Sequence, residues 1–431
     1  MSIITPVRDA AREQAVFRKV VLRIVPFLML CYVISYLDRV NVGFAKLQMS
    51  SDLGFSEAAF GLGAGLFFIG YFFFEVPSNM ILQKVGAKVW IARIMITWGI
   101  VSGSFMFVNN EIVFYILRFL LGVAEAGFYP GVIFYLTLWF PSHRRARVVA
   151  MFMSAIPLAG IFGNPLSGWI MGAFDEVGGL GGWQWMFVIE AIPAILIGIW
   201  TLFYLDSSVQ KAKWLTQDEK DIVEAAVAED SSHQTHQRLR DAFREPKVWL
   251  MCLIYFCFVM GQYALTFWTP TFVKSTGISS ELTIGVLSAI PFLAALIAMN
   301  LFGHSADRHR ERRWHLIIPA LMGAVGFSMA AVTTGSTVLA LISLSIAAAG
   351  VLTCAPLFWS LPTAFLGGSA AAAGIAVVNS VGNLAGFVSP YMIGAVKDAT
   401  DSTVVPMFIL SGILLVGALC VFSTKKDVVN R

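Results

Sequence analysis

The stretch LRFLLGVAEAGFYPG, residues 117–131, decides the fold class because it lies in a run fit for the middle of a lipid bilayer. It nevertheless contains an arginine, Arg118, and a glutamate, Glu125, with glycines around the acid. An ionisable group inside a membrane span is costly in free energy, and such groups usually mark an ion or substrate pathway. The stretch therefore predicts a membrane helix with charges that have a function.

The composition of the whole chain agrees with a membrane protein. The 431 residues are 58% hydrophobic and only 13% charged, whereas soluble chains have about 25% charged residues. The net charge of +4 is too small to indicate nucleic acid binding. All five cysteines fall in apolar runs, and the six histidines lie in polar loops or at span edges. We therefore expect no metal site and no cofactor. The common catalytic signatures HExxH, GKS/T and GxSxG are absent, so the chain is not expected to be an enzyme.

Twelve runs are long and apolar enough to span a membrane, which takes about 20 residues each. They are expected at 22–45, 57–81, 88–108, 112–139, 146–172, 183–205, 248–272, 282–303, 314–333, 336–358, 370–396 and 404–423. The long polar stretch 206–247 separates six spans from six. We therefore predict an all-α integral membrane protein with twelve transmembrane helices. An N-terminal six-helix bundle (1–205) and a C-terminal one (248–431) would be joined by a cytoplasmic linker (206–247).

The linker contains a helix signature of its own. Thr216 and Glu219 match the T-x-x-E capping box, which predicts a helix from there to about residue 230. Its apolar residues are spaced for one face, so we expect an amphipathic segment on the cytoplasmic surface of the membrane.

The basic residues set the orientation. All but five of the 30 lysines and arginines fall on the side of the two termini. Lys46, Lys274 and Lys397 fall on the other side, while Arg39 and Arg118 lie deep in the membrane. The positive-inside rule therefore predicts cytoplasmic termini and a multi-pass protein of the plasma membrane, a bacterial inner membrane in particular. We expect the protein to be a monomer in contact with lipid.

Acidic residues deep in the membrane are similarly rare and are confined to the first six spans. They are Asp38 in span 1, Glu75 in span 2, Glu125 in span 4 and Glu190 near the start of span 6. In the second six spans the polar candidates are Gln262, Tyr263, Trp359, Ser360, Asn379 and Asn383.

The two halves have similar loops at equivalent positions. Span 2 is followed by NMILQKVGAKVWIAR (79–93) and span 8 by GHSADRHRERR (303–313), both basic and turn-forming. Paired repeats of this kind are typical of transporters, whose substrate site lies near the midplane where the halves meet.

The loop GHSADRHR resembles the G-x-x-x-D-R motif of the major facilitator superfamily. In the first-half copy, Asn79 replaces the glycine and Gln83 replaces the aspartate, which argues against an acid-based latch at Gln83. The gating-motif residues that the resemblance implies are Gly303, Asp307, Arg308, Lys84 and Gly86.

Within that superfamily, segments from both halves are similar to the anion:cation symporter branch. They are YLDRVNVGFA (36–45), FFFEVPSNMIL (72–82), RFLLGVAEAGFYPG (118–131), LWFPSHRRAR (138–147), GWQWMFVIEAIPA (182–194) and NSVGNLAGFVSPYMIG (379–394). That branch includes tartrate, phthalate, hydroxyphenylacetate and sugar-acid transporters. The resemblance implies proton-coupled uptake of a small organic carboxylate by alternating access. It also implies that the Asp-Arg pair of span 1 and the Arg and Glu of span 4 are the working residues. An antiporter or exporter of organic anions or drugs is the alternative.

Helix geometry supports the same residues independently. Arg118 and Glu125 are seven residues apart, so they share one face of span 4, about 10 Å apart along the axis. Asp38, Arg39 and Arg118 fall at about the same depth, so we expect one cluster if spans 1 and 4 adjoin. Two arginines can hold a carboxylate, and nearby acids can compete for them or take a proton. The expected substrate-binding residues are Arg39, Arg118, Tyr71, Gln262, Tyr263, Trp359 and Asn379, and the expected proton-coupling residues are Asp38, Glu125 and Glu75.

Each of these charges also has a structural interpretation. Asp38 with Arg39, or Arg118 with Glu125, could be an ion pair that only holds helices together. For Glu75 a structural pair with a loop arginine is an equal alternative, and Glu190 is interpreted as structural. Asn379 could serve either the pocket or an interhelical hydrogen bond.

Overall fold

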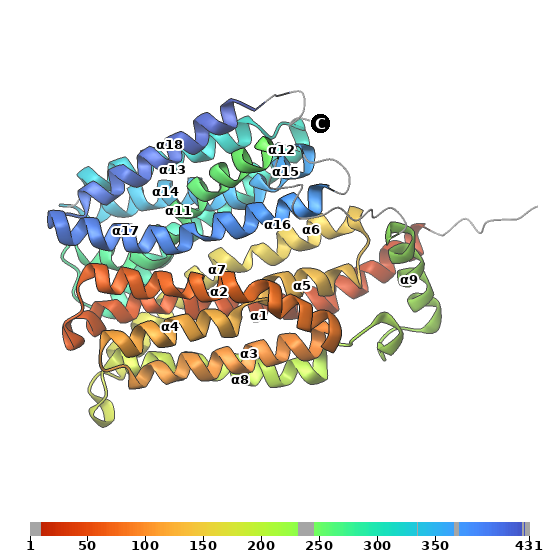
Figure 1. Cartoon of the computed structure of the whole chain (residues 1–431), viewed down its shortest axis with the longest axis horizontal. Helices are drawn as coiled ribbons and strands as arrows, with labels where there is room; N and C mark the ends of the chain where they lie inside the picture. The colour runs from red at the N-terminus through yellow and green to blue at the C-terminus, as the bar shows by residue number, and fades with distance from the viewer. Residues whose placement is uncertain (1–9, 232–244, 334, 366–369, 425, 427–431) are drawn as a thin grey trace, which may run out of the picture.

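The computed structural model describes residues 10–231, 245–333, 335–365, 370–424 and 426, and its helices run side by side along one long axis (Figure 1). The first half contains α1 (Ala10–Leu53), α2 (Glu57–Val85), α3 (Ala87–Gly103), η1 (Ser104–Phe107), α4 (Glu111–Glu125), α5 (Phe128–Thr137), α6 (Ser142–Met153), α7 (Ala155–Ala173), η2 (Val177–Gly179) and α8 (Gly182–Tyr204). After η3 (Val209–Lys211) and α9 (Gln217–Ser231), the second half contains α11 (Pro246–Lys274), α12 (Glu281–His309), α13 (Trp314–Val332), α14 (Thr337–Phe358), α15 (Ser360–Phe365), α16 (Ala370–Asn383), α17 (Ala385–Thr400) and α18 (Val404–Phe422).

Among the described residues, eleven helical stretches are long and apolar enough to cross a bilayer. The twelfth expected span, 370–396, is present as two shorter helices, α16 and α17, which meet at Leu384. Large apolar side chains such as Phe203 and Leu301 cover the outside of the bundle. Because this apolar surface has no protein partner, it suits contact with lipid chains. The fold class expected from the sequence is confirmed.

Span 4 is not one continuous helix. It consists of α4 and α5, separated by Ala126 and Gly127, and Gly127 has a φ of +87° that favours glycine. On α2, the Ser78 hydroxyl donates to the Ala126 carbonyl at 2.6 Å, and Trp90 of α3 donates to Ser78 at 2.9 Å. The break therefore falls directly after Glu125, the last residue of α4, and neighbouring helices hold it in place.

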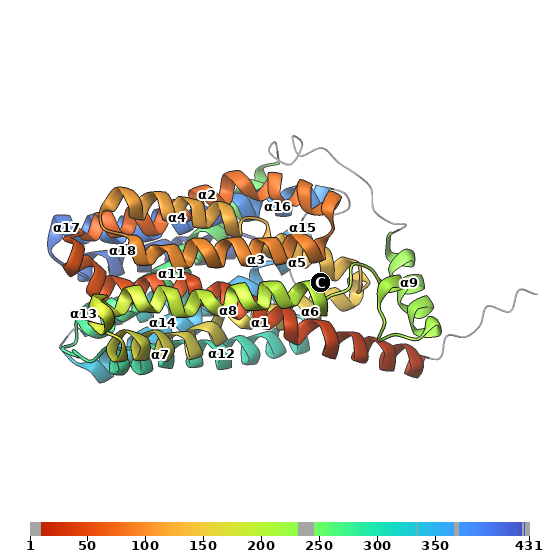
Figure 2. The same cartoon turned by 90° about the horizontal axis from the view of Figure 1, so that it is seen from below.

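The linker helix α9 lies beside the first turns of α1, as Figure 2 shows. Thr216 and Glu219 form the expected capping box, with hydrogen bonds of 2.9 and 3.4 Å. Lys19 of α1 binds Glu219 at 2.8 Å. The expectation that the apolar face of this helix rests on the membrane is wrong at Val223 and Ala226, because both are buried against protein.

The two ends of the bundle differ. We call the end at which α1 begins and α9 lies the terminal end, and the other end, where α1 ends at Leu53, the opposite end. The two halves touch mainly through α1 with α11, α2 with α17 and α7 with α12, and α2 also touches α16.

At the opposite end, glycines bring these helix pairs into backbone contact. A Cβ on Gly43 would lie 2.7 Å from the Phe267 carbonyl oxygen, and one on Gly61 would meet the Pro390 carbonyl. Gly168 and Gly285 make the same kind of contact between α7 and α12. Because no side chain separates the backbones here, the halves are closely packed at this end.

Candidate functional site

A cavity lies where the two halves meet and encloses about 650 Å³, its solvent-open part included. Its walls are lined by Tyr32, Tyr36, Arg39, Phe67, Phe68, Tyr71, Tyr129, Met153, Ile156, Tyr255, Val259, Gln262, Tyr263, Ala355, Trp359, Asn379 and Asn383. Arg39 is the one charged residue in this lining, as far as the structure describes it. The cavity is thus aromatic and polar, with a single fixed positive charge.

The Arg39 guanidinium is held by Glu125. Its Nε donates to Glu125 Oε1 at 2.9 Å, and its NH2 group also binds this oxygen. Ser35 donates to the same oxygen at 2.7 Å. Arg39 is 8% exposed and Glu125 is 2% exposed. The result is a buried ion pair between α1 and α4 with its cation on the cavity wall.

Aromatic rings surround the same guanidinium. Its central carbon lies 5.0 Å from the ring centre of Tyr36, 5.2 Å from Phe67 and 5.7 Å from Tyr71. Arginine stacks well on such rings and offers a planar fork of donors to a carboxylate. The site can therefore keep Arg39 oriented toward the cavity if Glu125 releases it.

Asp38 lies on a different side of α1 from Arg39. It accepts hydrogen bonds from Trp98 at 2.9 Å and Ser102 at 2.8 Å, both on α3, and from Asn41 at 3.3 Å. Adjacent residues on a helix point about 100° apart, so equal depth does not bring them to one face. Among the described contacts Asp38 therefore binds α3 and forms no ion pair with Arg39 or Arg118, and its role in proton coupling stays a prediction.

Arg118 lies near Arg39, since both guanidinium groups are 5.2 Å from the ring centre of Phe67, but it has different hydrogen-bond partners. Its guanidinium donates to the backbone carbonyls of Gly63 at 3.3 Å and Ala64 at 3.0 Å, both on α2. It is 1% exposed, does not line the cavity, and forms no ion pair with an acid of the described chain. Arg118 thus joins α4 to α2, and its expected contact with a substrate carboxylate stays a prediction.

The remaining predicted pocket residues do come together across the two halves. Gln262 of α11 donates to Tyr36 Oη at 3.0 Å, and Asn379 of α16 donates to Glu75 Oε1 at 3.4 Å. Glu75 is 8% exposed, and its hydrogen-bond partner among the described residues is this amide rather than a loop arginine. Tyr71, Tyr263 and Trp359 line the cavity as expected.

The gating-motif residues lie at the terminal end, away from the cavity lining. Asp307, in the last turns of α12, pairs with Arg312 at 2.6 Å. Gly303 and Arg308 belong to the same helix end. Lys84 is in the last turn of α2, and Gly86 follows it with a φ of +96°.

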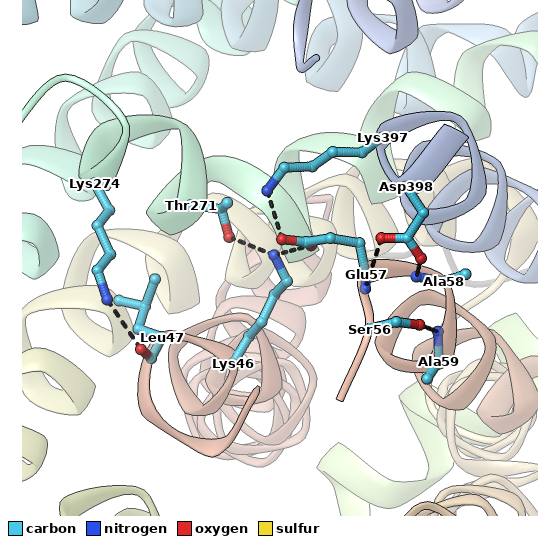
Figure 3. A network of polar contacts seen from close by, with 10 residues as sticks. All are labelled: Lys46, Leu47, Ser56, Glu57, Ala58, Ala59, Thr271, Lys274, Lys397 and Asp398. Atoms are coloured by element: carbon cyan, nitrogen blue, oxygen red, sulfur yellow. Dashed lines mark hydrogen bonds and ion pairs between the residues drawn. The ribbon is translucent and has the colours of Figure 1, made fainter. Parts of the chain in front are cut away.

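A second group of charges lies at the opposite end (Figure 3). Of its members, only the lysines were singled out in the sequence, as markers of orientation. Glu57 at the start of α2 pairs with Lys46 of α1 and with Lys397 of α17, each at 2.5 Å. Asp398 accepts hydrogen bonds from the backbone N–H groups of Glu57 at 3.1 Å and Ala58 at 2.8 Å. These contacts tie α2 of the first half to α17 of the second. The sequence offered one signal for this contact: Glu57 is an acid at the start of span 2, on the side of the membrane where only three lysines fall.

The fold and this buried charge arrangement define a membrane transport protein, and the comparison with protein families agrees. Residues 28–390 match the family model described as Major Facilitator Superfamily. The chain belongs to this superfamily.

Known relatives cover almost the whole chain. It is 50% identical over 420 residues to "Putative metabolite transport protein NicT" of Pseudomonas putida, with 97% of this chain and 96% of the relative covered. It is 50% identical over 409 residues to "Putative tartrate transporter" of Agrobacterium vitis, covering 94% and 90%. It is 39% identical over 413 residues to "Quinolone resistance transporter" of Acinetobacter baumannii, covering 95% of each. The chain is therefore similar to transporters, not enzymes.

A solved structure shares the fold. The bacterial homolog of the human lysosomal transporter Spinster, in an inward-facing and unoccupied conformation, aligns with a TM-score of 0.75 and 18% identity. The alignment covers 94% of this chain and 96% of that one. The chain is a multi-pass transporter with the architecture of this superfamily.

Proposed function

We propose that the protein imports a small organic carboxylate together with protons across a bacterial inner membrane, by alternating access. One observation carries the proposal: Arg39, the single charge in the described cavity lining, is bound by Glu125. A substrate carboxylate and Glu125 would therefore compete for one guanidinium.

This competition can link substrate to protons. When a carboxylate takes Arg39, an ionised Glu125 is left buried without a cation. Breaking a buried pair in this way costs about 3–5 kcal/mol. Protonation of Glu125 removes its charge and hence this cost, so binding of the anion and binding of a proton favour each other. Such mutual stabilisation is the thermodynamic requirement for symport.

The surrounding residues support a small, polar anion as the substrate. Gln262 and Asn379 offer amide groups, and Tyr71, Tyr263 and Trp359 offer ring faces and polar hydrogens to the same cavity. We propose these residues as substrate contacts. Arg118 is proposed to act indirectly, by holding α4 and its Glu125 against α2. The printed name of the tartrate relative agrees with a carboxylate.

The closed opposite end supports alternating access. We propose that the terminal end faces the cytoplasm, because of its basic residues, and that the Lys46–Glu57–Lys397 contacts close the outside. The proposed moving units are residues 1–205 and 248–431, which are joined by 206–247. If one unit rocks against the other, these contacts break and the cavity opens to the other side.

The test is transport by the purified protein in liposomes. An inward proton gradient should drive accumulation of a carboxylate such as tartrate, and a protonophore should abolish it. The Arg39→Ala variant should bind none of the acids that stabilise the wild-type protein in a thermal-shift panel. Uptake driven by a sodium gradient alone would contradict the proposal.

Proton-driven export of a drug is the second candidate, favoured by the aromatic lining and the quinolone-resistance relative. The same liposomes can test it with a fluoroquinolone and a proton gradient of either direction. Drug movement opposite to the proton flow, without carboxylate uptake, would favour export.

A further inference from the structure

A groove lies on the outside of the first half, between α2, α3 and α4, and encloses about 720 Å³, its open part included. We call it the outer groove. Among the described residues, its lining and that of the central cavity have no member in common. Phe74, Ile81 and Leu120 line it and are exposed, so the groove opens on the apolar surface that suits contact with lipid.

One charged side chain lines the outer groove within the described part of the chain, and it belongs to Arg93 of α3. Arg93 follows Ala87, the first residue of α3, by six positions, so it lies about 9 Å along the helix axis from the terminal end. A charge at such a depth in a membrane span is costly in free energy. Arg93 therefore needs a polar or anionic partner.

The protein satisfies only part of this need. The NH1 group of Arg93 donates to Thr97 Oγ1 at 3.4 Å, which is its one side-chain hydrogen bond to a described residue. The central guanidinium carbon lies 3.8 Å from the ring centre of Trp90, one turn nearer the terminal end. No ion pair of the described chain includes Arg93. Since a guanidinium carries five N–H groups, most of them remain available to a ligand.

The neighbouring charges favour an anion as this ligand. Lys84 is in the last turn of α2 and Lys88 is in the first turn of α3, so both lie where the walls of the groove reach the terminal end. Neither lysine forms an ion pair with a described residue. The acids Glu75 of α2 and Glu125 of α4 bind partners that line the central cavity instead. Basic pockets of this kind between membrane helices bind anionic lipid headgroups.

The length of the groove fits one leaflet of a bilayer. On α3 its lining runs from Trp90 to Val101, which is about 16 Å along the helix axis. The hydrocarbon core of a bilayer is about 30 Å thick, so one leaflet contributes about 15 Å. An acyl chain can therefore lie along the groove while its headgroup stays beside Arg93, whose side chain stacks on Trp90.

We propose that the outer groove is a binding site for a phospholipid of net negative charge from the leaflet at the terminal end. The phosphate accepts hydrogen bonds from the Arg93 guanidinium, and one acyl chain lies along the apolar lining toward Val101. Lys84 and Lys88 favour the negative charge of the headgroup. The site depends neither on the substrate that is carried nor on proton coupling.

Native mass spectrometry of the purified protein tests the site. The probes are phosphatidylglycerol, which has a net negative charge, and phosphatidylcholine, which has the same acyl chains and no net charge. Wild-type protein should retain one phosphatidylglycerol in preference to phosphatidylcholine. Equal retention of the two lipids, or retention of neither in detergent, would overturn the proposal.

Variants at two arginines locate the headgroup. Arg93→Gln should lower the retained phosphatidylglycerol about fivefold or more, which is the contribution of one basic residue near a membrane surface. Arg93→Lys keeps the charge and should retain most of the lipid. The matched control is Arg23, whose central guanidinium carbon lies 3.9 Å from the ring centre of Tyr204, outside the groove. Arg23→Gln should retain lipid as wild type does, and a loss equal to that of Arg93→Gln would overturn the proposal.

A variant at Val101 tests the acyl chain. Val101→Trp fills the groove away from the charges, so it should lower lipid retention although Arg93 is intact. Full retention by this variant would place the lipid outside the groove and would overturn the proposal. Each variant is measured below its own melting temperature, so that loss of lipid is not loss of fold. Failure of carboxylate transport would show in the liposome assay and would leave these lipid results in place.

Discussion

Replacing Glu57 by glutamine should open the opposite end of the transporter. The change removes one negative charge that pairs with two lysines across the halves. The Lys46 side chain is 4% exposed, whereas the Glu57 and Lys397 side chains are 28% and 22% exposed.

The magnitude lies between two limits. An exposed pair contributes about 0.2–1 kcal/mol, and breaking a buried one costs about 3–5 kcal/mol. Because the pairs are partly exposed and glutamine can still accept one hydrogen bond, we expect a loss of about 1.4 kcal/mol, which is about tenfold in population. Only the closed state should lose this energy, since the proposed rocking motion breaks the pairs in the open state.

The assay measures the distance between spin labels on Ser51 and Ser279, which are both exposed at the opposite end, on different halves. Cys420 is the one native cysteine that is not fully buried, so it is replaced by serine first. The variant should show a long-distance population about tenfold larger than its parent. Glu281→Gln removes the same charge at the start of α12, outside the ion pairs that the structure describes, and serves as the control. A distance distribution identical to the parent would refute the reasoning.

The remaining predictions concern the site and the linker. Arg39→Lys should weaken carboxylate binding by tenfold or more in calorimetry, because lysine loses the planar fork of donors. The melting temperature should stay near that of wild type, because lysine keeps the charge; equal affinity would contradict a bidentate contact. Arg118→Ala should lower the melting temperature, since it removes the hydrogen bonds that join α4 to the Gly63 and Ala64 carbonyls of α2, and binding should be retained at low temperature; complete loss of binding by a folded variant would show a direct role. Partial burial raises the pKa of Glu219, but hydrogen bonds from Lys19 and Thr216 lower it further, so its pKa lies below the usual value. The stabilising effect of Glu219 is therefore complete above the usual glutamate pKa and is lost as the pH falls through its lowered pKa. In wild type, limited proteolysis should cut near α9 faster at acid pH. In Glu219→Gln, the cutting rate should be the same at all pH values.

The sequence predicted the membrane class and most helices because apolar length is a local property. It also predicted most of the charges that are buried, since few charges occur in the spans, but it did not predict the burial of Lys46. It could not predict their partners. Depth follows from position in a helix, but the direction of a side chain depends on how the helices pack. Asp38 and Arg39 are neighbours in the chain, yet Asp38 forms hydrogen bonds with α3 and Arg39 binds Glu125 of α4.

Two further features required the folded chain. The break after Glu125 has a sequence cue in Gly127, but only the hydrogen bond from Ser78 shows that a neighbouring helix holds it. The contact of Glu57 with Lys397 joins residues 340 positions apart. No local pattern predicts such a pair, although both residues are polar positions at span ends.

The comparison of Glu125→Gln with wild type in liposomes tests the central claim most directly. Glutamine keeps the size of the acid and mimics its protonated form, so Arg39 is free for substrate but no proton is released during the cycle. The account predicts that the variant retains exchange of labelled for unlabelled substrate and loses accumulation driven by a proton gradient. If the variant accumulates substrate against its gradient as well as wild type does, Glu125 is not the coupling site.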